Sequence, residues 1–313
     1  MRLDLPPSVL AFGARGPRWQ AFVDGLPRLL DDLVAEWELT PTGEVWSGYA
    51  SVVLPVRRAA GGEAQDAVLK VTFPEDEETE HEPLALQHWH GRGAVLLLRA
   101  DPHRRAMLLE RLHRRDLNAL DPLDACEVVA GLYPSLHVPA PPQLRSFTGY
   151  LNRWREPLAD LPRDAPVPRR MVEQALSLLR DLTGDPASTG TVLHHDLHYQ
   201  NVLAGEREPW LAIDPQAMSG DPHAEPAPML WNRWDELVGP GAGDVRTGLR
   251  ARFHTIVDAA GLDEDRARAW VVVRMVVNAY WSIEDAERLG RLLDADERDW
   301  ITRCVAVVKA VQD

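Results

Sequence analysis

Apolar and polar positions recur with different periods along the chain, and these periods separate a strand-rich stretch from a long helical remainder. Residues 17–37 carry apolar side chains at helical spacing and predict a helix. Short runs rich in β-branched residues follow, separated by turns, and predict strands. The predicted strands are 38–42, 50–57, 67–73, 94–98 and 106–109, with a predicted helix at 79–92 among them.

The chain beyond residue 113 is mostly helical in pattern. Short apolar runs at 192–193, 202–203 and 210–213 flank a polar loop and predict brief strands, and 219–222 predicts a turn. The predicted helices are 121–137, 144–161, 168–183, 224–238, 243–260, 263–281, 283–293 and 296–311.

These patterns predict an α+β fold with two parts. A small β-sheet lobe with one important helix is expected at 1–112, and a larger, mostly helical lobe at 113–313. A length of 313 residues is sufficient for two lobes that share one function.

Composition limits the kinds of partner. With 48 acidic and 34 basic residues, the formal net charge is −14. Such a chain is poorly suited to nucleic acids, which need basic patches, whereas it attracts cationic molecules. No apolar run approaches the roughly 18 residues of a membrane span, and the N-terminus lacks a signal-peptide pattern. Because the two cysteines, Cys126 and Cys304, suggest no disulfide scaffold, we expect a cytoplasmic protein, most simply a monomer.

The polar loop carries the residues that suggest chemistry. Asp196 is a carboxylate that could accept a hydroxyl proton, and Asn201 and Asp214 offer the oxygen ligands that Mg²⁺ prefers. Two other interpretations remain open. The histidines at 194, 195 and 198 could bind a metal, although their spacing matches no common zinc site, or the loop could be an ordinary polar turn.

A lysine and a glutamate in the first lobe form a second candidate pair. Lys70 and Lys309 are the two lysines among 34 basic residues, and Lys70 lies in the apolar run AVLKV of a predicted strand. Lysine and arginine are not interchangeable, so a lysine retained here draws attention. Glu82 lies near the start of the next predicted helix and is the candidate partner of Lys70. Glu78 and Glu80 are alternatives for this partner.

The loop sequence HHDLHYQN at 194–201 resembles the H-x-D-x-x-x-x-N catalytic loop of the aminoglycoside phosphotransferases, kinase-like enzymes of antibiotic resistance. Ile213-Asp214-Pro215 resembles their counterpart of the kinase D-F-G motif. The order of predicted elements also fits, from the strand lysine and helical glutamate to this loop. The resemblance spans roughly residues 35–300, and it is nearest to the branch of streptomycin 6-phosphotransferases and hydroxyurea phosphotransferases.

This resemblance implies a two-lobed, protein-kinase-like fold that uses ATP and Mg²⁺. Asp196 would be the catalytic base, and Asn201 and Asp214 would hold the metal ion. Lys70, held by Glu82, would contact the nucleotide phosphates. The remaining implied nucleotide contacts are Ser47 and Gly48 in the loop at 43–49, and the backbone of Glu110 and Leu112 in the hinge between lobes.

The resemblance also implies a polycationic acceptor, whose pocket should present carboxylates. For each candidate the alternative is an ordinary solvated helix face. His195 stands where the family usually has glycine, so we expect its side chain to crowd or contact the substrate, while His194 braces the loop and Asp221 ties its backbone. The candidate carboxylates are Glu225, Asp235, Glu236, Asp285 and Glu287, and Trp231, Trp234 and Trp281 could wall the pocket.

The sequence therefore predicts an ATP-dependent kinase for a hydroxyl of a small molecule, with a streptomycin-type aminoglycoside as the expected acceptor. Two alternatives stay open: a kinase for another small hydroxyl metabolite, and a nucleotide-binding protein without turnover. A metal hydrolase built on the histidine cluster is a more distant third. The intact set of Lys70, Asp196, Asn201 and Asp214 argues against loss of catalysis.

Overall fold

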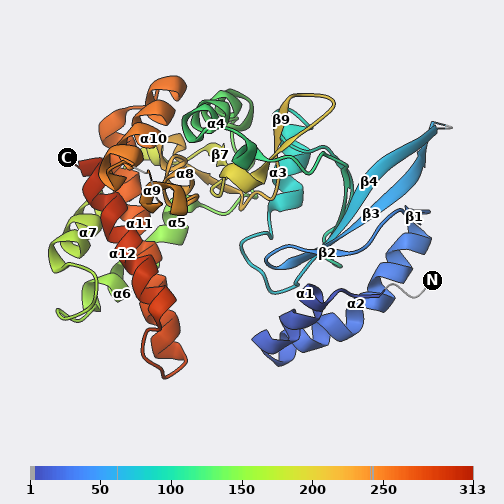
Figure 1. The fold of residues 1–313 in the computed structure, drawn as a ribbon, viewed down its shortest axis with the longest axis horizontal. Coiled ribbons are helices and arrows are strands. Elements are labelled where there is room, and N and C mark those ends of the chain that lie inside the picture. The colour runs from blue at the N-terminus through green and yellow to red at the C-terminus, as the bar shows by residue number, and fades with distance from the viewer. Residues whose placement is uncertain (1–3, 62, 240, 242, 313) are drawn as a thin grey trace. The chain divides into compact units, whose positions relative to one another are not determined.

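The structure, a computed structural model, describes residues 4–61, 63–239, 241 and 243–312. The chain divides into two units, Met1–His113 and Arg114–Asp313, which are called unit 1 and unit 2 and described separately. The division lies one residue from the expected boundary after residue 112. Figure 1 shows unit 1 from blue to cyan and unit 2 from green to red.

Unit 1 is built on a six-stranded antiparallel sheet with strand order β1-β3-β4-β6-β5, and β2 pairs with β3. The register places Lys70 of β4 between Val53 of β3 and Met107 of β6. Figure 1 shows β3 and β4 as a long hairpin. The elements are α1 (Pro7–Leu10), η1 (Ala11–Arg15), α2 (Pro17–Glu36), β1 (Thr40–Pro41), β2 (Trp46–Ser47), β3 (Ser51–Ala60), β4 (Glu63–Thr72), α3 (Glu82–Trp89), β5 (Leu97–Asp101) and β6 (Ala106–Glu110).

Alternation along β4 gives the two faces of this sheet different helices, because successive side chains of a strand point to opposite faces. Leu69 and Val71 belong to one apolar core with Leu30 of α2, so α2 covers their face. Lys70 points to the other face. There α3 lies, because its first residue, Glu82, bonds to Lys70. Figure 1 shows α2 and α3 on opposite sides of the sheet.

Unit 2 is mainly helical, with two short antiparallel strand pairs, β7 with β10 and β8 with β9. Its helices are α4 (Pro122–Leu136), α5 (Phe147–Asn152), α6 (Arg155–Asp160), α7 (Arg169–Thr183), α8 (Ala227–Trp231), α9 (Asp235–Val238), α10 (Val245–Ala260), α11 (Glu264–Arg288) and α12 (Ala295–Gln312). Its strands and single turns of 3₁₀ helix are η2 (Leu117–Ala119), η3 (Pro186–Ser188), β7 (Thr191–Leu193), η4 (Tyr199–Asn201), β8 (Val202–Ala204), β9 (Trp210–Ala212), β10 (Met218–Gly220) and η5 (Pro222–Ala224).

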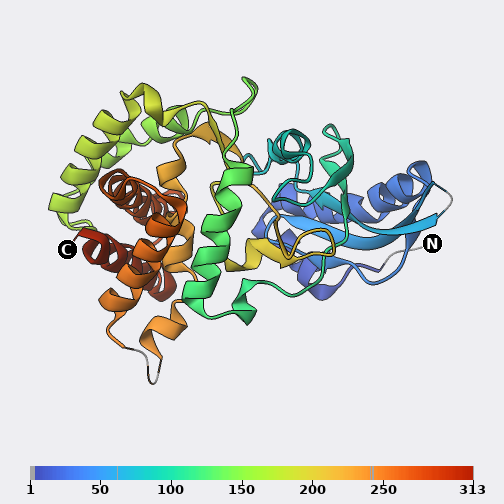
Figure 2. The ribbon, with the colours of Figure 1, turned by 90° about the horizontal axis from the view of Figure 1, so that it is seen from above.

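The core of unit 2 forms around α11. Trp270, Val271 and Met275 of this helix are almost completely buried, together with Phe253 of α10 and Val307 of α12. Figure 2 shows these helices, coloured orange to red, gathered at the end of unit 2 that carries the C-terminus. Among the described helices, none combines the length and the apolar character that crossing a membrane would require.

Several predicted boundaries are wrong. The predicted helix 144–161 is two helices, α5 and α6, separated at Arg153 and Trp154. The predicted helix 224–238 is broken into η5, α8 and α9, because Asn232 is extended and Arg233 has a left-handed φ of 53°. Left-handed backbone cannot continue a right-handed helix.

Three further predictions need correction. The predicted helices 263–281 and 283–293 are one helix, α11, whose buried face continues through Ile283 and Ala286. The predicted turn 219–222 overlaps β10, which completes a ladder with β7. The predicted strand 94–98 begins late, since β5 starts at Leu97, where its pairing with β6 begins.

We predict that Leu30→Ala lowers the free energy of unfolding of unit 1 by about 2–5 kcal/mol, because it leaves a cavity under the sheet. Leu30 is completely buried, whereas Leu10 of the same unit is 53% exposed and provides the matched control as Leu10→Ala. Chemical denaturation followed by tryptophan fluorescence measures both. Equal losses for the two variants would contradict the described packing of α2.

Candidate active site

Lys70 and Glu82 form a buried ion pair in unit 1, as the sequence predicts. Lys70 Nζ lies 2.7 Å from each of the two Glu82 carboxylate oxygens. The two side chains are 7% and 1% exposed. Because Lys70 belongs to the central strand β4 and Glu82 begins α3, the pair fixes the helix to the sheet. It also holds the ammonium group in one place, as binding of phosphate oxygens requires.

The turn that contains Ser47 and Gly48 is a tight hairpin. Ser47 belongs to β2 and lies opposite Val52 of β3. The Gly48 N–H donates to the Ser51 carbonyl at 2.7 Å, and a Cβ added at Gly48 would lie 2.7 Å from the Ser51 hydroxyl oxygen. The Gly48 N–H is therefore used within the hairpin. This corrects its predicted part as a phosphate-binding amide, while the role of Ser47 stays a prediction.

Glu110 lies at the end of β6 and is bound to the chain just before β5. Its backbone N–H donates to the Leu96 carbonyl at 3.0 Å, and its carboxylate accepts from the Leu96 N–H at 2.8 Å. Both groups thus hold the sheet edge together. Leu112 follows in an extended, half-buried segment. Contacts of Glu110 and Leu112 with an adenine ring stay a prediction.

In unit 2, the predicted catalytic loop follows β7 and ends in η4. Asn201 Nδ2 donates to the Asp196 carbonyl at 2.8 Å and lies 3.2 Å from Asp196 Oδ2. His198 Nε2 lies 3.6 Å from the same carboxylate, whose side chain is 24% exposed. The structure therefore brings Asp196 and Asn201 together and leaves the carboxylate accessible to a small molecule.

Glu225 anchors the backbone of this loop through hydrogen bonds to its carboxylate. Its side chain is fully buried, and its Oε1 accepts from the His194 N–H at 2.5 Å and the His195 N–H at 3.2 Å. His137 Nε2 lies 3.8 Å away. Burial alone would raise the pKa of Glu225, but His137 and the loop hydrogen bonds outweigh burial and lower this pKa. Glu225 thus stays ionised and holds the loop.

This position corrects the prediction that Glu225 lines a substrate pocket, because the carboxylate is buried and bonded to the backbone. No local sequence signal marks its role, since Glu225 lies 31 residues beyond His194 and the two meet only when unit 2 folds. A buried carboxylate at about 1% exposure needs such partners to offset its desolvation.

His194 braces the loop from within, as expected. Its Nε2 lies 2.9 Å from the Ile213 carbonyl, and its Nδ1 accepts from the Asp196 N–H at 3.4 Å. Burial lowers the pKa of His194, and this effect outweighs the negative charge of Glu225, which alone would raise the pKa. The ring is therefore neutral, and its Nε2, which faces the Ile213 carbonyl, carries the proton. The ring therefore links the residue before Asp214 to the backbone of Asp196.

His195 is buried rather than directed at a ligand. It is 6% exposed, its ring contacts Phe147 edge-on at 5.0 Å between centroids, and Arg274 Nη1 lies 2.8 Å from its Nδ1. Burial and the neighbouring Arg274 guanidinium hold its pKa well below the usual range. The expectation that this side chain crowds the substrate is therefore wrong. Its φ of 67° is the left-handed conformation that a glycine adopts easily.

Asp214 and Asn201 meet the chemical requirements of a magnesium site. The Ile213 N–H donates to the Asn201 carbonyl at 2.9 Å, so Asp214 follows directly beside Asn201, and Asp214 has a φ of 59°. Because Asn201 Nδ2 donates to Asp196, its Oδ1 is the atom that can face a cation. Mg²⁺ is commonly held by one or two such oxygens together with phosphates of the substrate. The donor set therefore fits.

The histidine cluster does not form a metal site of its own. Among the described residues, no group of three or more His, Cys, Asp and Glu side chains is arranged to hold a metal ion. His194 and His195 instead contact the protein as described, and His198 Nδ1 accepts from the Gln200 N–H at 3.3 Å. This arrangement removes the support for a metal hydrolase.

The other predicted carboxylates lie on exposed helix surfaces of unit 2. Asp235 and Glu236 begin α9, where Glu236 bonds to Arg233 at 2.7 Å. Asp285 of α11 bonds to Arg288 at 2.8 Å, and Glu287 is also exposed. Their contact with a substrate stays a prediction. Trp231, Trp234 and Trp281 are half-buried against the helical core, and Trp281 contacts Tyr150 and Trp154 edge-on.

Asp221 connects the segment after β10 to helix α11. It accepts from Trp270 Nε1 at 2.7 Å and Arg266 Nε at 2.5 Å, and its Oδ1 lies 2.6 Å from His223 Nδ1. Burial would raise its pKa, but these hydrogen bonds outweigh burial and lower the pKa of Asp221 to about 2. Asp221 therefore ties chain segments together, as expected.

We predict that Lys70→Met destabilises unit 1 by about 3–5 kcal/mol, because it leaves the Glu82 carboxylate buried without its cation. The double variant Lys70→Met with Glu82→Leu should regain most of this loss, since it removes both charges. Denaturant unfolding of the two variants measures the difference. A double variant no more stable than Lys70→Met would show that the pair is not the source of the loss.

We predict a pH-dependent effect of Glu225→Gln. The pKa of Glu225 is lower in the folded protein than in the unfolded chain. The ionised carboxylate therefore stabilises the folded protein above the unfolded pKa, and this stabilisation is lost as pH falls through the folded pKa. At pH 7 the variant should lose about 1–3 kcal/mol of unfolding free energy. The difference from wild type should narrow below about pH 4. A difference constant down to the acid transition, or one shared by the exposed Asp235→Asn, would contradict this role.

Comparison with known proteins places the chain in a family. Residues 36–286 match the family described as aminoglycoside/hydroxyurea antibiotic resistance kinase. The chain is 42% identical to the streptomycin 6-kinase of Streptomyces glaucescens over 290 residues, which cover 90% of this chain and 92% of that relative. It is 41% identical to the hydroxyurea phosphotransferase of Kitasatospora aureofaciens over 281 residues, which cover 87% and 77% of the two chains.

A solved structure supports the fold. A thermostable mutant of the aminoglycoside phosphotransferase APH(4)-Ia, in ternary complex with ADP and hygromycin B, superposes with a TM-score of 0.56 at 17% identity, over 90% of this chain and 98% of that one. At this level of identity the likeness concerns the fold, which is protein-kinase-like as predicted. The chain belongs to the family of aminoglycoside and hydroxyurea antibiotic resistance kinases.

Proposed function

We propose that the chain transfers the γ-phosphoryl group of ATP to a hydroxyl of a streptomycin-type aminoglycoside, and so inactivates the antibiotic. The observation that carries this proposal is the braced loop, in which Asn201 holds an accessible Asp196 carboxylate. Similarity to a streptomycin 6-kinase over nine-tenths of the chain supports the choice of acceptor. The predicted monomeric state and cytoplasmic location stay predictions.

Asp196 acts as the general base. Its carboxylate accepts the proton of the acceptor hydroxyl as the hydroxyl oxygen bonds to the γ-phosphorus, and the bond to the β,γ-bridging oxygen breaks to release ADP. Asn201 keeps one carboxylate oxygen fixed at 3.2 Å, which orients the other for the substrate. His194 and Glu225 hold the loop backbone, so the base stays in one geometry during the transfer.

Lys70, Asn201 and Asp214 serve the nucleotide. Lys70, held by Glu82 on both oxygens, binds phosphate oxygens of ATP. Asn201 and Asp214 would hold Mg²⁺, which when bound supplies positive charge to the phosphates in the transition state. ADP in the structurally similar phosphotransferase supports this use of nucleotide.

An acidic chain suits a polycationic acceptor. The formal net charge of −14 attracts cations over distances of about 10 Å at moderate salt. Asp235, Glu236 and Asp285 remain the candidate contacts of its amino and guanidino groups. These residues are exposed and already lie in helices of unit 2.

Hydroxyurea is the second candidate acceptor, because a hydroxyurea phosphotransferase is as similar in sequence as the streptomycin kinases. It is small and uncharged, so it gains nothing from the acidic surface. Another small hydroxyl metabolite is a further alternative. Nucleotide binding without turnover fits poorly, because the ion pair and the loop are both intact.

We predict that Asp196→Ala lowers kcat for phosphate transfer to streptomycin by about 10²–10⁴-fold, since general-base catalysis typically contributes that much. Asp181→Ala on α7, whose carboxylate is exposed and has no proposed contact with the substrate, is the matched control for loss of a carboxylate. ATP consumption with streptomycin, hydroxyurea and choline as separate acceptors measures the rate. Full activity of Asp196→Ala would exclude this residue as the base. Turnover with hydroxyurea and not with streptomycin would show that hydroxyurea is the acceptor.

A further inference from the structure

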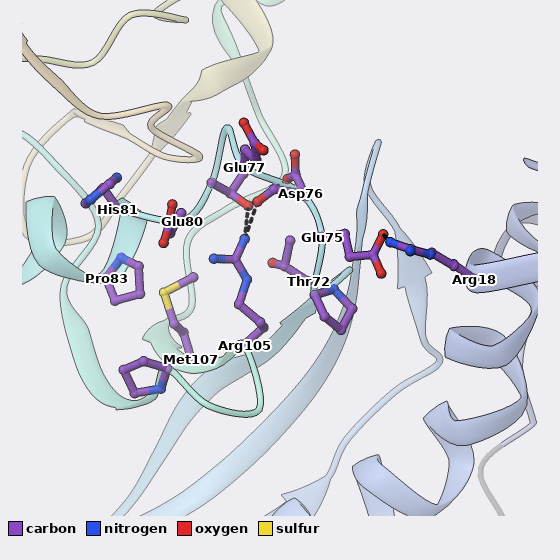
Figure 3. Close-up of a pocket in the computed structure, with 13 residues that line it drawn as sticks. Arg18, Thr72, Glu75, Asp76, Glu77, Glu80, His81, Pro83, Arg105 and Met107 are labelled. Atoms are coloured by element: carbon purple, nitrogen blue, oxygen red, sulfur yellow. Dashed lines mark hydrogen bonds and ion pairs between the residues drawn. The ribbon is translucent and has the colours of Figure 1, made fainter. Parts of the chain in front are cut away.

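A residue other than glycine in left-handed backbone needs contacts that hold it there, because steric contact of its Cβ disfavours this conformation. Arg105 of unit 1, with a φ of 53°, has such contacts. Its Nη2 donates to the Thr79 hydroxyl at 2.9 Å and to the Asp76 carbonyl at 2.5 Å. Figure 3 shows the Arg105 side chain extended toward Asp76. His195 of unit 2, with a φ of 67°, needs contacts of the same kind, and it directly precedes Asp196.

Aromatic side chains confine the ring of His195. The ring lies edge-on to Phe147 at 5.0 Å and to Tyr150 at 6.1 Å between centroids. Phe147 is itself fixed, since it is 1% exposed and packs so closely on Gly220 that a Cβ added there would lie 2.7 Å from the Phe147 Cβ. Glu225 holds the His195 backbone N–H but does not hold its ring. The ring therefore depends on separate contacts.

Arg274 of α11 supplies the polar contact of this ring. Its Nη1 lies 2.8 Å from His195 Nδ1, although the two residues are 79 positions apart in the chain. Both side chains are buried. Because a guanidinium group only donates hydrogen bonds, the ring nitrogen that faces it accepts and carries no proton. Hydrogen bonds in which one partner is charged are stronger than those between neutral groups. Arg274 can therefore hold the ring in one orientation.

Arg274 is in turn held by its own helix and by two tryptophans. Its guanidinium carbon lies 5.8 Å from the ring centroid of Trp231 and 5.5 Å from that of Trp281, within the range of cation–π attraction. The next residue in the helix, Met275, is completely buried in the core of unit 2. Movement of this part of α11 would disturb that core. The guanidinium group thus gives His195 a rigid support.

We propose that Arg274 is a positioning residue for phosphate transfer. Through the His195 ring it holds the left-handed backbone that presents the Asp196 carboxylate to the acceptor hydroxyl. Glu225 fixes the backbone of the loop, and Arg274 fixes the side chain of the residue before the base. The effect on catalysis rests on the proposed function, whereas the effect on the loop backbone does not.

The shape of the side chain matters as well as its charge. A planar guanidinium group can lie against tryptophan rings and donate to the His195 ring at the same time, whereas a lysine ammonium group is a point charge on a flexible stem. Arg274→Lys keeps a donor for the ring nitrogen, and Arg274→Met removes the donor. We expect the loss of activity to be smaller in the lysine variant than in the methionine variant.

The test is a double-mutant cycle on kcat for phosphate transfer to streptomycin, with Arg274→Met and His195→Gly. Glycine adopts the left-handed conformation without a side chain. In the wild-type background Arg274→Met should lower kcat about 10- to 100-fold, since small displacements of a catalytic group cost that much. In the His195→Gly background the same change should lower kcat less than about 2-fold, because Arg274 acts through the ring.

Arg268→Met is the matched control on the same helix. The Arg268 guanidinium group bonds to Glu264 and Asp265 in the first turn of α11 and has no proposed part in catalysis. This variant should keep the kcat of the wild type. All values of kcat are expressed per folded protein, measured by circular dichroism, and Arg274→Lys provides the comparison where Arg274→Met does not fold.

Hydrogen exchange of the full chain without nucleotide or acceptor tests the loop directly. The amides of residues 194–197 should exchange faster in Arg274→Met than in the wild type and Arg268→Met. Equal exchange of these amides in all three proteins, or additive losses of kcat in the cycle, would overturn the proposal. Faster exchange in Arg274→Met, with no transfer to streptomycin by the wild type, would instead contradict the proposed function and leave the effect on the loop intact.

Discussion

A single buried carboxylate, that of Glu225, sets the geometry on which the catalytic loop depends. Burying an ionised carboxylate is unfavourable unless hydrogen bonds and opposite charge offset the lost hydration. Here the N–H groups of His194 and His195 and the nearby His137 provide that offset. Movement of the loop backbone would leave the buried Glu225 carboxylate without its hydrogen-bond donors, which is unfavourable. Asp196 directly follows His195, so the hydrogen bonds to Glu225 also fix the position of Asp196.

Unit 1 contains a second buried charge, at the proposed nucleotide-binding residues. Lys70 and Glu82 are both buried, so each needs the other, and their contact sets the distance between sheet and helix. The buried Glu225 carboxylate fixes the proposed base, Asp196, in unit 2, and the buried Glu82 carboxylate fixes the Lys70 ammonium group, proposed to bind phosphate, in unit 1. The chemistry proposed for this family member needs positioning more than covalent assistance, which is what such rigid contacts supply.

Contacts that are local in the sequence could be predicted, and those created by folding could not. The candidate chemistry of the loop from His194 to Asn201 follows from residue type and spacing, whereas the pair of Lys70 with Glu82 is implied by the family resemblance. The structure contains both. Glu225 was assigned to a substrate pocket because an acidic residue on a helix resembles a surface residue until its burial is known. The sequence places His195 at the substrate because the resembled family usually has glycine there. Its contact with Arg274, 79 residues away, forms only when unit 2 folds. Predicted helix limits are wrong where a left-handed residue ends a helix, as at Arg233, or where the buried face continues past the predicted end, as at Ile283.

The most direct test of the account is identification of the product when wild-type protein, ATP and Mg²⁺ are incubated with streptomycin. Mass spectrometry measures whether the antibiotic gains one phosphoryl group, and phosphorus NMR shows whether an ester at a hydroxyl carries it. The account predicts phosphorylated streptomycin and ADP in equal amounts. ADP formation without any phosphorylated streptomycin, or transfer only to an acceptor without amino or guanidino groups, would contradict it.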